Sequence, residues 1–430
     1  MKICVFGLWH LGSVIAAGLA ESGHTVTGLD FDQEKIGNLR NARAPIAESG
    51  LNELILKNLR EKKLSFTYAP QSALADAEVL WIAFDTPVDE QDNADPGYIE
   101  KNFEAVAEFL PDRIKILISS QVPVGFTRTL ARKFHEKYPD KKAFFAYSPE
   151  NLRLGKALKT FLEPDRIVIG TESDEKEMFF PVFLPVSDRL EWMSIESAEM
   201  TKHAINSFLA TSICFANEIA TLCEYVGADA KEVERGLKTE ERIGPKAYLT
   251  PGNAFSGGTL ARDIRFLQKL GDNNHLPVYL INAVLNSNDF HKTWIKRKCR
   301  EALGDLKGKH ISVLGLTYKP GTDTLRRSFS VELCTWLHNE GATVTAFDPA
   351  IHELPPELQK ILLLSPDSTS AVKNADCLII ATEWPEFRKI KKDTLIEMRT
   401  KILIDPDGFV EKNLGTAQNI RYLTVGRDLS

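Results

Sequence analysis

Short apolar runs alternate with longer amphipathic stretches along the first 195 residues of the chain. The apolar runs are rich in β-branched residues, and examples are Lys2–Phe6, Thr25–Leu29, Glu78–Phe84, Ile114–Ser119 and Arg166–Ile169. Short, fully apolar strands with helices between them are typical of a parallel sheet that is covered on both faces. The pattern therefore predicts a doubly wound α/β domain over residues 1–195.

The pattern changes in the middle of the chain. Ala, Leu, Ile and Phe recur at helical spacing without a break over Ser197–Val226, and helical sequence continues to about Leu303. Strand–helix alternation then resumes, with apolar runs at His310–Leu314, Thr343–Phe347, Asp376–Ala381 and Lys401–Ile404. We therefore expect two doubly wound Rossmann-like domains, 1–195 and 304–430, joined by a long central helix and a helical region over 196–303.

The long helix over Ser197–Val226 also suggests how the protein assembles. Its apolar residues cover more than one face of the helix. The surface that its own domains do not cover must therefore be buried elsewhere, and we expect a homodimer built on this helix.

Composition excludes several classes of partner. The chain has 430 residues, 43% hydrophobic and 26% charged, and its net charge of −6 argues against nucleic acid as the main partner. It begins directly with a strand-like run and has no apolar run long enough to span a bilayer, so we expect no leader and no membrane partner. The nine histidines and six cysteines have no metal-ligand spacing. We expect no metal site, and buried reduced thiols in a cytoplasmic protein.

The first helix opens with a motif for dinucleotide binding. The segment Gly7-Leu8-Trp9-His10-Leu11-Gly12 follows a strand, which is the context of the G-x-G-x-x-G fingerprint. Both outer glycines are present, whereas Trp9 replaces the middle glycine that lets the backbone approach the pyrophosphate. Asp30 ends the second strand, where an acid holds the adenosine ribose and repels a 2′-phosphate. We predict that NAD binds here rather than NADP; a domain that has lost its cofactor is the alternative, and the sequence does not decide whether Trp9 points outward or stacks on the cofactor.

Five further segments resemble known motifs in order along the chain. They are Ala83–Pro87 (A-F-D-T-P), Ser120–Gly125 (S-Q-V-P-V-G), Ser148–Ala157 (S-P-E-N-L-R-L-G-K-A), Ala198–Asn206 (A-E-M-T-K-H-A-I-N) and Gly315–Arg326 (G-L-T-Y-K-P-G-T-D-T-L-R). Together with the three-part architecture they resemble the UDP-glucose/GDP-mannose dehydrogenase family across nearly the whole chain. The resemblance implies an NAD-dependent enzyme, a nucleotide-sugar substrate and a homodimer.

The family oxidises the C6 alcohol of a sugar nucleotide to a carboxylate with two NAD, by way of a thioester on a cysteine. The resemblance implies that Lys202, Asn206, Asp263 and Glu150 are catalytic. Lys202 and Asn206 lie four apart on one helix face, so both can reach the oxygen that becomes an alkoxide. Asp263 would hold water or orient Lys202, and Glu150 would act as acid and base in the thioester stage. The alternative is a solvated helix face and a loop aspartate.

The resemblance also implies binding residues. For the cofactor they include Thr86, Gln121, Lys319 and Arg326, besides the fingerprint residues. For the substrate they are Asn151, Leu152, Arg153, Tyr248, Gly252, Gly257 and Gly258. The glycines let backbone N–H groups face phosphate oxygens, and the two cations can neutralise phosphate charge. A solvated surface pair is the alternative for Lys319 and Arg326, and UDP-hexose is the default ligand only because it is the commonest in the family.

One segment departs from the family pattern. The loop Phe255–Asp263 reads F-S-G-G-T-L-A-R-D, where the family has G-G-S-C-F-P-K-D with a nucleophilic cysteine. Thr259 is the nearest hydroxyl and has no histidine nearby in sequence to activate it, and Cys214 is a stand-in by position only. Leu154 also stands where the family has a second glutamate.

The missing cysteine shapes the functional prediction. We predict a single two-electron oxidation of a nucleotide sugar to an aldehyde or ketone, or a redox-neutral rearrangement. One alternative is full oxidation to a uronic acid by a thiol-free route. The other is a catalytically silent paralogue that binds a sugar nucleotide.

Overall fold

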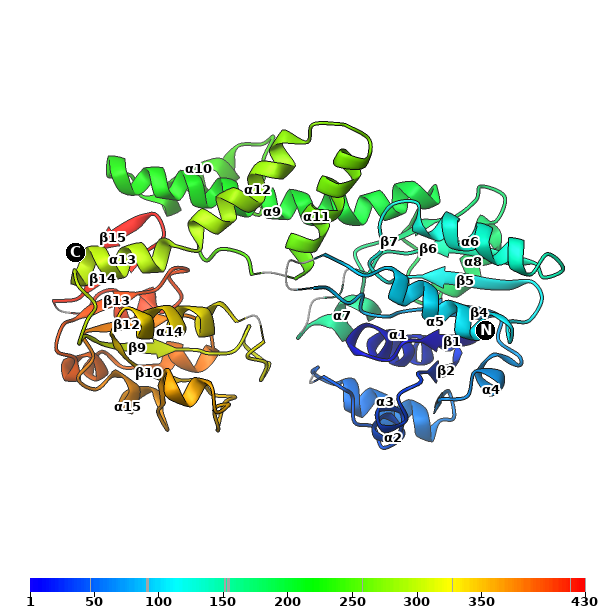
Figure 1. The fold of residues 1–430 in the computed structure, drawn as a ribbon, viewed down its shortest axis with the longest axis horizontal. Coiled ribbons are helices and arrows are strands. Elements are labelled where there is room, and N and C mark those ends of the chain that lie inside the picture. The colour runs from blue at the N-terminus through cyan, green and yellow to red at the C-terminus, as the bar shows by residue number, and fades with distance from the viewer. Residues whose placement is uncertain are drawn as a thin grey trace. The chain divides into compact units, whose positions relative to one another are not determined.

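The computed structural model describes residues 1–46, 48–89, 93–150, 152, 155–256, 258–326, 328–417 and 419–429. The chain separates into two compact units, Met1–Ile205 and Asn206–Ser430, each with its own sheet (Figure 1). Both sheets are mostly parallel and have helices between their strands. The predicted fold of two doubly wound α/β sheets is therefore confirmed.

The first unit contains an eight-stranded sheet of order β3-β2-β1-β4-β5-β6-β7-β8. Its strands are β1 (Lys2–Phe6), β2 (Thr25–Leu29), β3 (Leu64–Thr67), β4 (Val79–Ile82), β5 (Ile114–Ile118), β6 (Ala143–Tyr147), β7 (Ile167–Gly170) and β8 (Leu190–Met193). All neighbours pair in parallel except β6 and β7. The helices between them are α1 (His10–Glu21), α2 (Gln33–Arg40), α3 (Leu51–Arg60), α4 (Pro70–Leu74), α5 (Gly97–Ala107), α6 (Phe126–Lys137), α7 (Ala157–Leu162) and α8 (Lys176–Phe183).

Strand β1 shows why the apolar runs have no polar alternation. Ile3 and Val5 belong to one buried hydrophobic cluster, while Cys4 and Phe6 belong to a second one. Successive side chains of a strand point to opposite faces of the sheet, so both faces are covered by apolar side chains. Fully apolar strands are the sequence signature of that burial.

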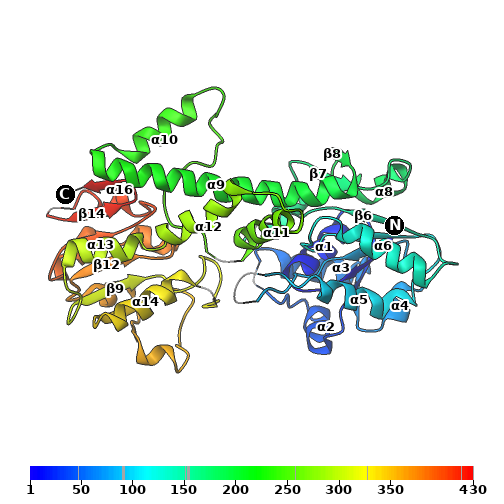
Figure 2. The same cartoon turned by 45° about the horizontal axis from the view of Figure 1, so that its top comes forward.

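The second unit contains a seven-stranded sheet of order β11-β10-β9-β12-β13-β14-β15. Its strands are β9 (His310–Leu314), β10 (Thr343–Phe347), β11 (Leu363–Leu364), β12 (Cys377–Ile380), β13 (Ile402–Ile404), β14 (Arg421–Thr424) and β15 (Arg427–Leu429), with only β15 antiparallel to its neighbour. Helices α14 (Phe329–Asn339), α15 (Ser368–Val372) and α16 (Glu411–Leu414) accompany them, and Figure 2 shows α14 beside β9. The first six strands follow the same order outward as in the first unit. Each sheet therefore has a switch point at the carboxyl end of its first strand, which is where such sheets bind ligands.

A helical region precedes the second sheet. The long helix α9 (Ile195–Val226) confirms the predicted helix and begins two residues earlier. It is followed by α10 (Ala230–Thr239), α11 (Thr259–Asn273), α12 (Tyr279–His291) and α13 (Trp294–Leu303). A buried cluster that includes Ala210, Ile264 and Val284 packs α9, α11 and α12 together. The proposed division into three domains at 195 and 303 stays a prediction.

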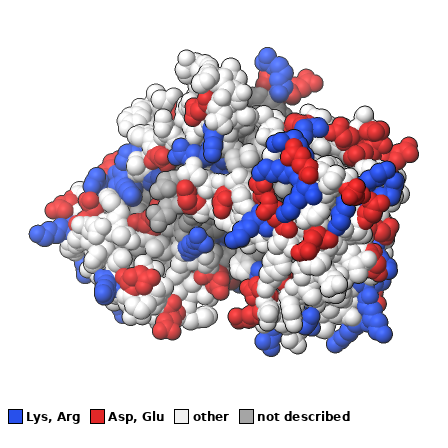
Figure 3. Space-filling view, turned by 45° about the vertical axis from the view of Figure 1, so that its right-hand side comes forward, with Lys and Arg blue, Asp and Glu red and all other residues white. Residues whose placement is uncertain are grey.

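The surface and the cysteines agree with the composition. Figure 3 shows Lys and Arg interspersed with Asp and Glu over the face that it presents. No helix in the part of the chain that the structure describes is long and apolar enough to cross a membrane. All six cysteines are buried free thiols, which confirms their interpretation as core residues.

Candidate active site

The two outer glycines of the fingerprint are required by close packing. Gly7 has a φ of +93°, and a Cβ there would lie 2.7 Å from the ring of Phe84. A Cβ on Gly12 would lie 1.7 Å from the carbonyl oxygen of Gly7. Any larger residue at either position would displace the turn between β1 and α1, so this turn is built as a dinucleotide-binding turn requires.

Trp9 occupies the middle of this turn at a negative φ. Its φ is −82°, a value open to any residue, and its side chain is 45% exposed. The Nζ atom of Lys35, on α2, lies 6.0 Å from the centre of the indole ring. The indole therefore points out of the core, on the side of the turn where α2 begins.

Asp30 joins the end of β2 to the fingerprint turn. Its Oδ2 atom accepts hydrogen bonds of 2.8 Å from the backbone N–H of Leu8 and from Lys35 Nζ. Its Oδ1 atom accepts one of 3.0 Å from the backbone N–H of Asp32. A buried carboxylate at the end of the second strand fits the ribose of an adenine dinucleotide, although Lys35 offsets part of its charge.

Two further predicted cofactor residues meet at the carboxyl ends of β4 and β5. Thr86 and Gln121 are both buried, and the hydroxyl of Thr86 donates a 2.6 Å hydrogen bond to the carbonyl oxygen of Gln121. These strand ends lie across the switch point from β2. The structure thus brings Thr86 and Gln121 together on the opposite side of the turn from Asp30.

Glu48 is a residue that the sequence analysis missed. One of its carboxylate oxygens lies 3.1 Å from His10 Nε2, at the start of α1, and also accepts from the backbone N–H of Gly155 at 2.8 Å. The other accepts from the N–H of Ala157 at 2.9 Å. Glu48 therefore ties the fingerprint helix, in which Leu11 is buried, to the end of the Ser148–Ala157 motif. No local pattern marks this residue, because its partners are distant in the chain.

The buried Lys202 pairs with the half-buried Glu150 in the first unit. Lys202 is 5% exposed, and its Nζ atom donates to the carbonyl oxygen of Glu150 at 2.6 Å and to Oε1 at 3.2 Å. The backbone N–H of Leu152 donates to the other carboxylate oxygen at 2.7 Å. Both carboxylate oxygens accept hydrogen bonds, so the buried ammonium group of Lys202 has an oppositely charged partner in a fixed orientation, which a buried charge requires. Asn151, Arg153 and Leu154 lie outside the described residues.

Asn206 and Asp263 form a second pair, in the second unit. Both side chains are buried, and Asn206 Nδ2 donates a hydrogen bond to Asp263 Oδ2. Asp263 lies in the second turn of α11, whose first residue, Thr259, is exposed. The four predicted catalytic residues therefore occur as two hydrogen-bonded pairs, each with one member on α9.

Glu199 gives α9 a further role that its motif did not reveal. This buried carboxylate accepts hydrogen bonds from the backbone N–H groups of Gly125 and Thr127, at the start of α6. Burial raises the pKa of its carboxyl group. A ring nitrogen of His203 also lies 2.9 Å from the carbonyl oxygen of Val122. The helix that carries Lys202 thus holds the backbone of the Ser120–Gly125 motif.

The second sheet repeats the turn of the first. Gly315 has a φ of +96°, and the backbone N–H groups of Leu316 and Thr317 donate to Asp348 Oδ2, at the end of β10, at 2.7 and 2.9 Å. Leu8 and Asp30 are arranged in the same way in the first unit. The relation between the two α/β halves, which the sequences do not show strongly, is plain in this turn.

The remaining predicted binding residues lie in loops of the second unit. Lys319, half-buried, and Arg326, exposed, belong to the segment between β9 and α14. Tyr248 is exposed and Gly252 is buried. Gly258 precedes α11 with a φ of +108°, which favours glycine, and Gly257 lies outside the described residues.

Cys214 does not have the environment of a nucleophile. Its Sγ atom donates to the carbonyl oxygen of Val284 at 3.3 Å, and burial raises the pKa of the thiol to about 11. A thiol is nucleophilic as the thiolate, so this one is inert at neutral pH. Cys214 is therefore a core residue.

Comparison with known proteins decides the family. Three models of the UDP-glucose/GDP-mannose dehydrogenase family match in succession: the NAD binding domain over residues 1–183, the central domain over 196–290 and the UDP binding domain over 312–412. The UDP-glucose 6-dehydrogenase of Rhizobium meliloti (strain 1021) is 35% identical over 437 residues, which cover 99% of this chain and 100% of that protein. The chain belongs to the UDP-glucose/GDP-mannose dehydrogenase family. The predicted cofactor, NAD, and the predicted class, an NAD-dependent nucleotide-sugar dehydrogenase, are confirmed.

Solved structures of the family agree over the whole chain. A UDP-glucose dehydrogenase from the hyperthermophilic archaeon Pyrobaculum islandicum has a TM-score of 0.89 at 31% identity, covering 99% of this chain and 97% of that one. A UDP-D-ManNAc dehydrogenase from Pyrococcus horikoshii has a TM-score of 0.86 at 26% identity, covering 99% of both chains. Family members of this fold thus differ in the sugar that their names give, and the roles of individual residues in this chain stay predictions.

Proposed function

We propose that this family member oxidises one alcohol group of a UDP-hexose in a single two-electron step, or rearranges the sugar without net redox change. The proposal rests on the presence of two predicted catalytic pairs together with the absence of a nucleophilic cysteine. The pairs Lys202–Glu150 and Asn206–Asp263 are present, and all their side chains are buried except the half-buried Glu150, whereas the loop Phe255–Asp263 contains no cysteine. The groups suited to alcohol oxidation are retained, and the group that would trap an aldehyde is not.

The proposed step requires stabilisation of an alkoxide and a path for its proton. NAD, when bound, supplies the hydride acceptor. Lys202 and Asn206 lie four residues apart on α9, so they share a helix face and would donate hydrogen bonds to the sugar oxygen as its negative charge develops. An ammonium group has three donors, and Glu150 takes two of those of Lys202. Asp263 would hold the water that receives the alcohol proton.

Two other functions differ from this proposal in a measurable product. Full oxidation would pass through the aldehyde hydrate, with Glu150 activating water, and would yield a uronic acid. A silent paralogue would bind the sugar nucleotide and form no product, but the retention of both hydrogen-bonded pairs and of Asp30 counts against it. Mass spectrometry of the sugar nucleotide after incubation with NAD separates the three: an aldehyde, ketone or isomer supports the proposal, whereas a uronic acid or unchanged substrate contradicts it.

We predict that NAD binds at least tenfold more tightly than NADP, because the buried Asp30 carboxylate opposes a 2′-phosphate. Isothermal titration with both cofactors measures this, and Asp30→Asn should narrow the difference. Trp9→Gly should leave the preference unchanged, since the indole does not create it. If neither cofactor binds the wild-type protein and Trp9→Gly restores binding, the indole blocks the cofactor site at the fingerprint turn. The silent paralogue then becomes the better proposal.

We also propose a homodimer in which α9 of a second copy covers α9. Phe208, Phe215 and Leu222 are exposed on this helix at seven-residue intervals, and Tyr225 and Val226 extend the apolar surface. Residues seven apart share one face of a helix, and a face of this kind is the usual seam between paired helices.

The buried free cysteines fit the reducing cytoplasm, which we propose as the location of the protein.

The dimer proposal predicts twice the chain mass by light scattering at micromolar concentration. Replacing both Phe208 and Leu222 by serine should give a monomer, because the seam loses two of its apolar side chains. Leu363→Ser removes an equally exposed leucine from β11 and should leave the dimer intact. A wild-type monomer would rule out this interface.

A further inference from the structure

The segment that leads into the glycine-rich loop is held by side chains instead of by secondary structure. Asn288, on α12, binds both backbone groups of Phe255: its Oδ1 accepts from the N–H at 2.9 Å, and its Nδ2 donates to the carbonyl at 2.8 Å. Asn217, on α9, accepts from the backbone N–H of Gly252 at 2.9 Å. The two ends of the segment Gly252–Phe255 are thus fixed by two buried amides.

His291 completes the hold on Gly252. Its Nε2 atom lies 2.8 Å from the carbonyl oxygen of Gly252. Burial lowers the pKa of the imidazole, so the ring is neutral at physiological pH, and a carbonyl partner requires the proton on Nε2. Both backbone groups of Gly252 are therefore taken by side chains from two different helices.

Asp407 holds the same segment from the second sheet. It follows β13, at the carboxyl end of the strands, and accepts hydrogen bonds from the backbone N–H of Asn253 at 2.8 Å and from Asn253 Nδ2. A Cβ on Gly252 would lie 2.0 Å from Asp407 Oδ1. Only glycine lets the carboxylate approach this closely, so the contact of Asp407 with the segment requires glycine at position 252.

Burial of the polar side chains that hold this segment indicates that they fix its backbone conformation. Asn217 and Asn288 are each 2% exposed, and His291 is 5% exposed. Burying a polar group destabilises the fold unless the group is hydrogen-bonded. Apolar side chains at these positions would fill the core without that desolvation penalty, but they would not bind the backbone. The bonded groups fix one backbone path into the loop that ends at Asp263, and a site accurate enough for catalysis requires such support.

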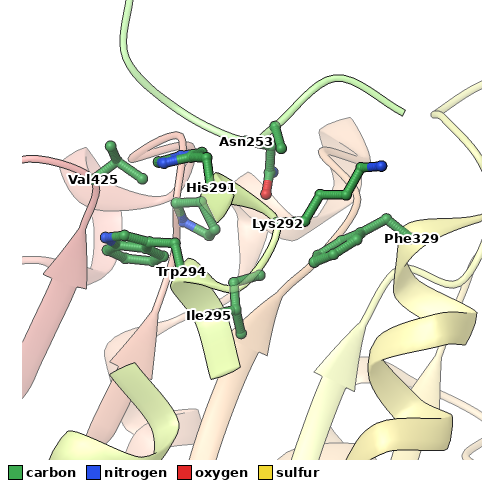
Figure 4. Close-up of a pocket in the computed structure, with 9 residues that line it drawn as sticks. Asn253, His291, Lys292, Trp294, Ile295, Phe329 and Val425 are labelled. Atoms are coloured by element: carbon green, nitrogen blue, oxygen red, sulfur yellow. The ribbon is translucent and has the colours of Figure 1, made fainter. Parts of the chain in front are cut away.

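The contact between Asn253 and Asp407 also joins two domains of the family. Asn253 falls within the match to the central domain, and Asp407 within the match to the UDP binding domain. Asn253 lines a pocket at the carboxyl end of the second sheet, together with Pro406, the residue before Asp407, and Val425, which follows β14. Figure 4 shows the side chain of Asn253 directed into this pocket, with Ile295 and Phe329 on its far side. A ligand at this end of the sheet would meet the segment that Asp407 holds.

We propose that Asp407 is a positioning residue that couples the UDP binding domain to the glycine-rich loop. Binding of a nucleoside diphosphate at the second sheet would fix the segment Gly252–Phe255 through Asn253, and with it Thr259 and Asp263. Binding energy from the non-reacting nucleotide would in this way be used to place the groups at the sugar. The inference rests on the proposed function for its substrate, but the coupling can be tested with UDP alone.

Hydrogen exchange provides that test. In the wild-type protein, UDP should slow exchange of backbone amides in a peptide covering residues 252–263. Asp407→Asn should still bind UDP but lose most of this protection, because the two donors of Asn253 face different carboxylate oxygens and the substitution turns one of these acceptors into an NH2 donor. Adding Asn253→Asp to that variant restores a carboxylate facing an amide and should restore the protection. Asp428→Asn, an exposed control on β15, should behave as the wild type does.

Turnover gives a second, separate readout. We expect kcat of Asp407→Asn to fall by about 10- to 100-fold, the effect of a small misplacement in an active site, and the exchanged pair to recover most of it. A positioning role is overturned if UDP protects the loop equally in Asp407→Asn, if UDP does not protect it in the wild type, or if the exchanged pair fails to restore protection while its melting temperature is normal. Absence of wild-type turnover with UDP-sugars, alongside the expected protection pattern, would reject the proposed function and leave the coupling standing.

Discussion

Replacing Lys202 by methionine is expected to abolish sugar oxidation. The wild-type ammonium group is buried, bonded to two oxygens of Glu150, and on the same helix face as Asn206. Methionine keeps the unbranched chain up to one atom short of the ammonium group but cannot stabilise an alkoxide. Loss of a charged donor in a dry site costs several kcal/mol of transition-state stabilisation, so kcat should fall by about 10³-fold or more. Initial rates of NADH formation with a saturating UDP-sugar measure the effect.

The controls separate chemistry from folding. Removing one member of a buried ion pair also destabilises a protein, because the partner charge is left alone. The melting temperature and the affinity for NAD should therefore be measured on the same preparation, and double replacement with Glu150→Gln should recover stability but not activity. Lys159→Ala, which removes an exposed lysine on α7, should leave kcat unchanged. A Lys202→Met protein that is folded and retains a tenth of wild-type activity would exclude an essential role for this ammonium group.

The wild-type protein should release at most one NADH for each UDP-sugar consumed. The loop Phe255–Asp263 has no thiol to hold an aldehyde for a second oxidation. The thiol of Cys214 is buried in the core with its pKa raised to about 11. Oxidation of the alcohol would stop at the aldehyde or ketone, or the hydride would return to the sugar and free NADH would not accumulate. Absorbance of NADH at completion, with the sugar products identified by mass spectrometry, gives the ratio.

Two substitutions sharpen this experiment. Thr259→Cys places a thiol at the first residue of α11, where the positive end of a helix favours the thiolate, and should raise the ratio toward two with a uronic acid product. Cys214→Ser should leave both rate and ratio nearly unchanged. A wild-type ratio of two with uronic acid would reject the single-step proposal and establish a thiol-free route, for which Glu150 would be the group that activates water.

Local patterns were sufficient for the fold because burial leaves a direct mark on sequence. Apolar runs such as Lys2–Phe6 and His310–Leu314 coincide with strands β1 and β9, since a strand covered on both faces must be apolar throughout. The helical spacing over Ser197–Val226 likewise gave α9 to within two residues. The resemblance of ordered motifs then gave the family, the cofactor and the class of enzyme, which the family models confirm.

The partners of the site residues could not be predicted in this way. The sequence suggested that Asp263 would hold water or orient Lys202, but it did not reveal the hydrogen bonds of Lys202 to Glu150 and of Asn206 to Asp263. Glu48 and Asp407 went unnoticed, although each holds backbone groups of a functional segment. A hydrogen bond between residues more than a hundred positions apart leaves no periodic pattern in the sequence. A carboxylate that binds the backbone of a distant loop depends on where the fold places it, and its sequence neighbours do not reveal this.

The sequence by itself thus determined the two parallel sheets, the long helix, the NAD-binding turn and the absence of a cysteine from the glycine-rich loop, because each is a property of neighbouring residues. Only the tertiary structure decided that the Trp9 indole points outward beside Lys35 and that Cys214 is an inert core thiol. It also decided that Gly252 is glycine to admit the carboxylate of Asp407. These outcomes depend on which distant side chains are packed together, and packing is settled by the shape and polarity of the whole fold.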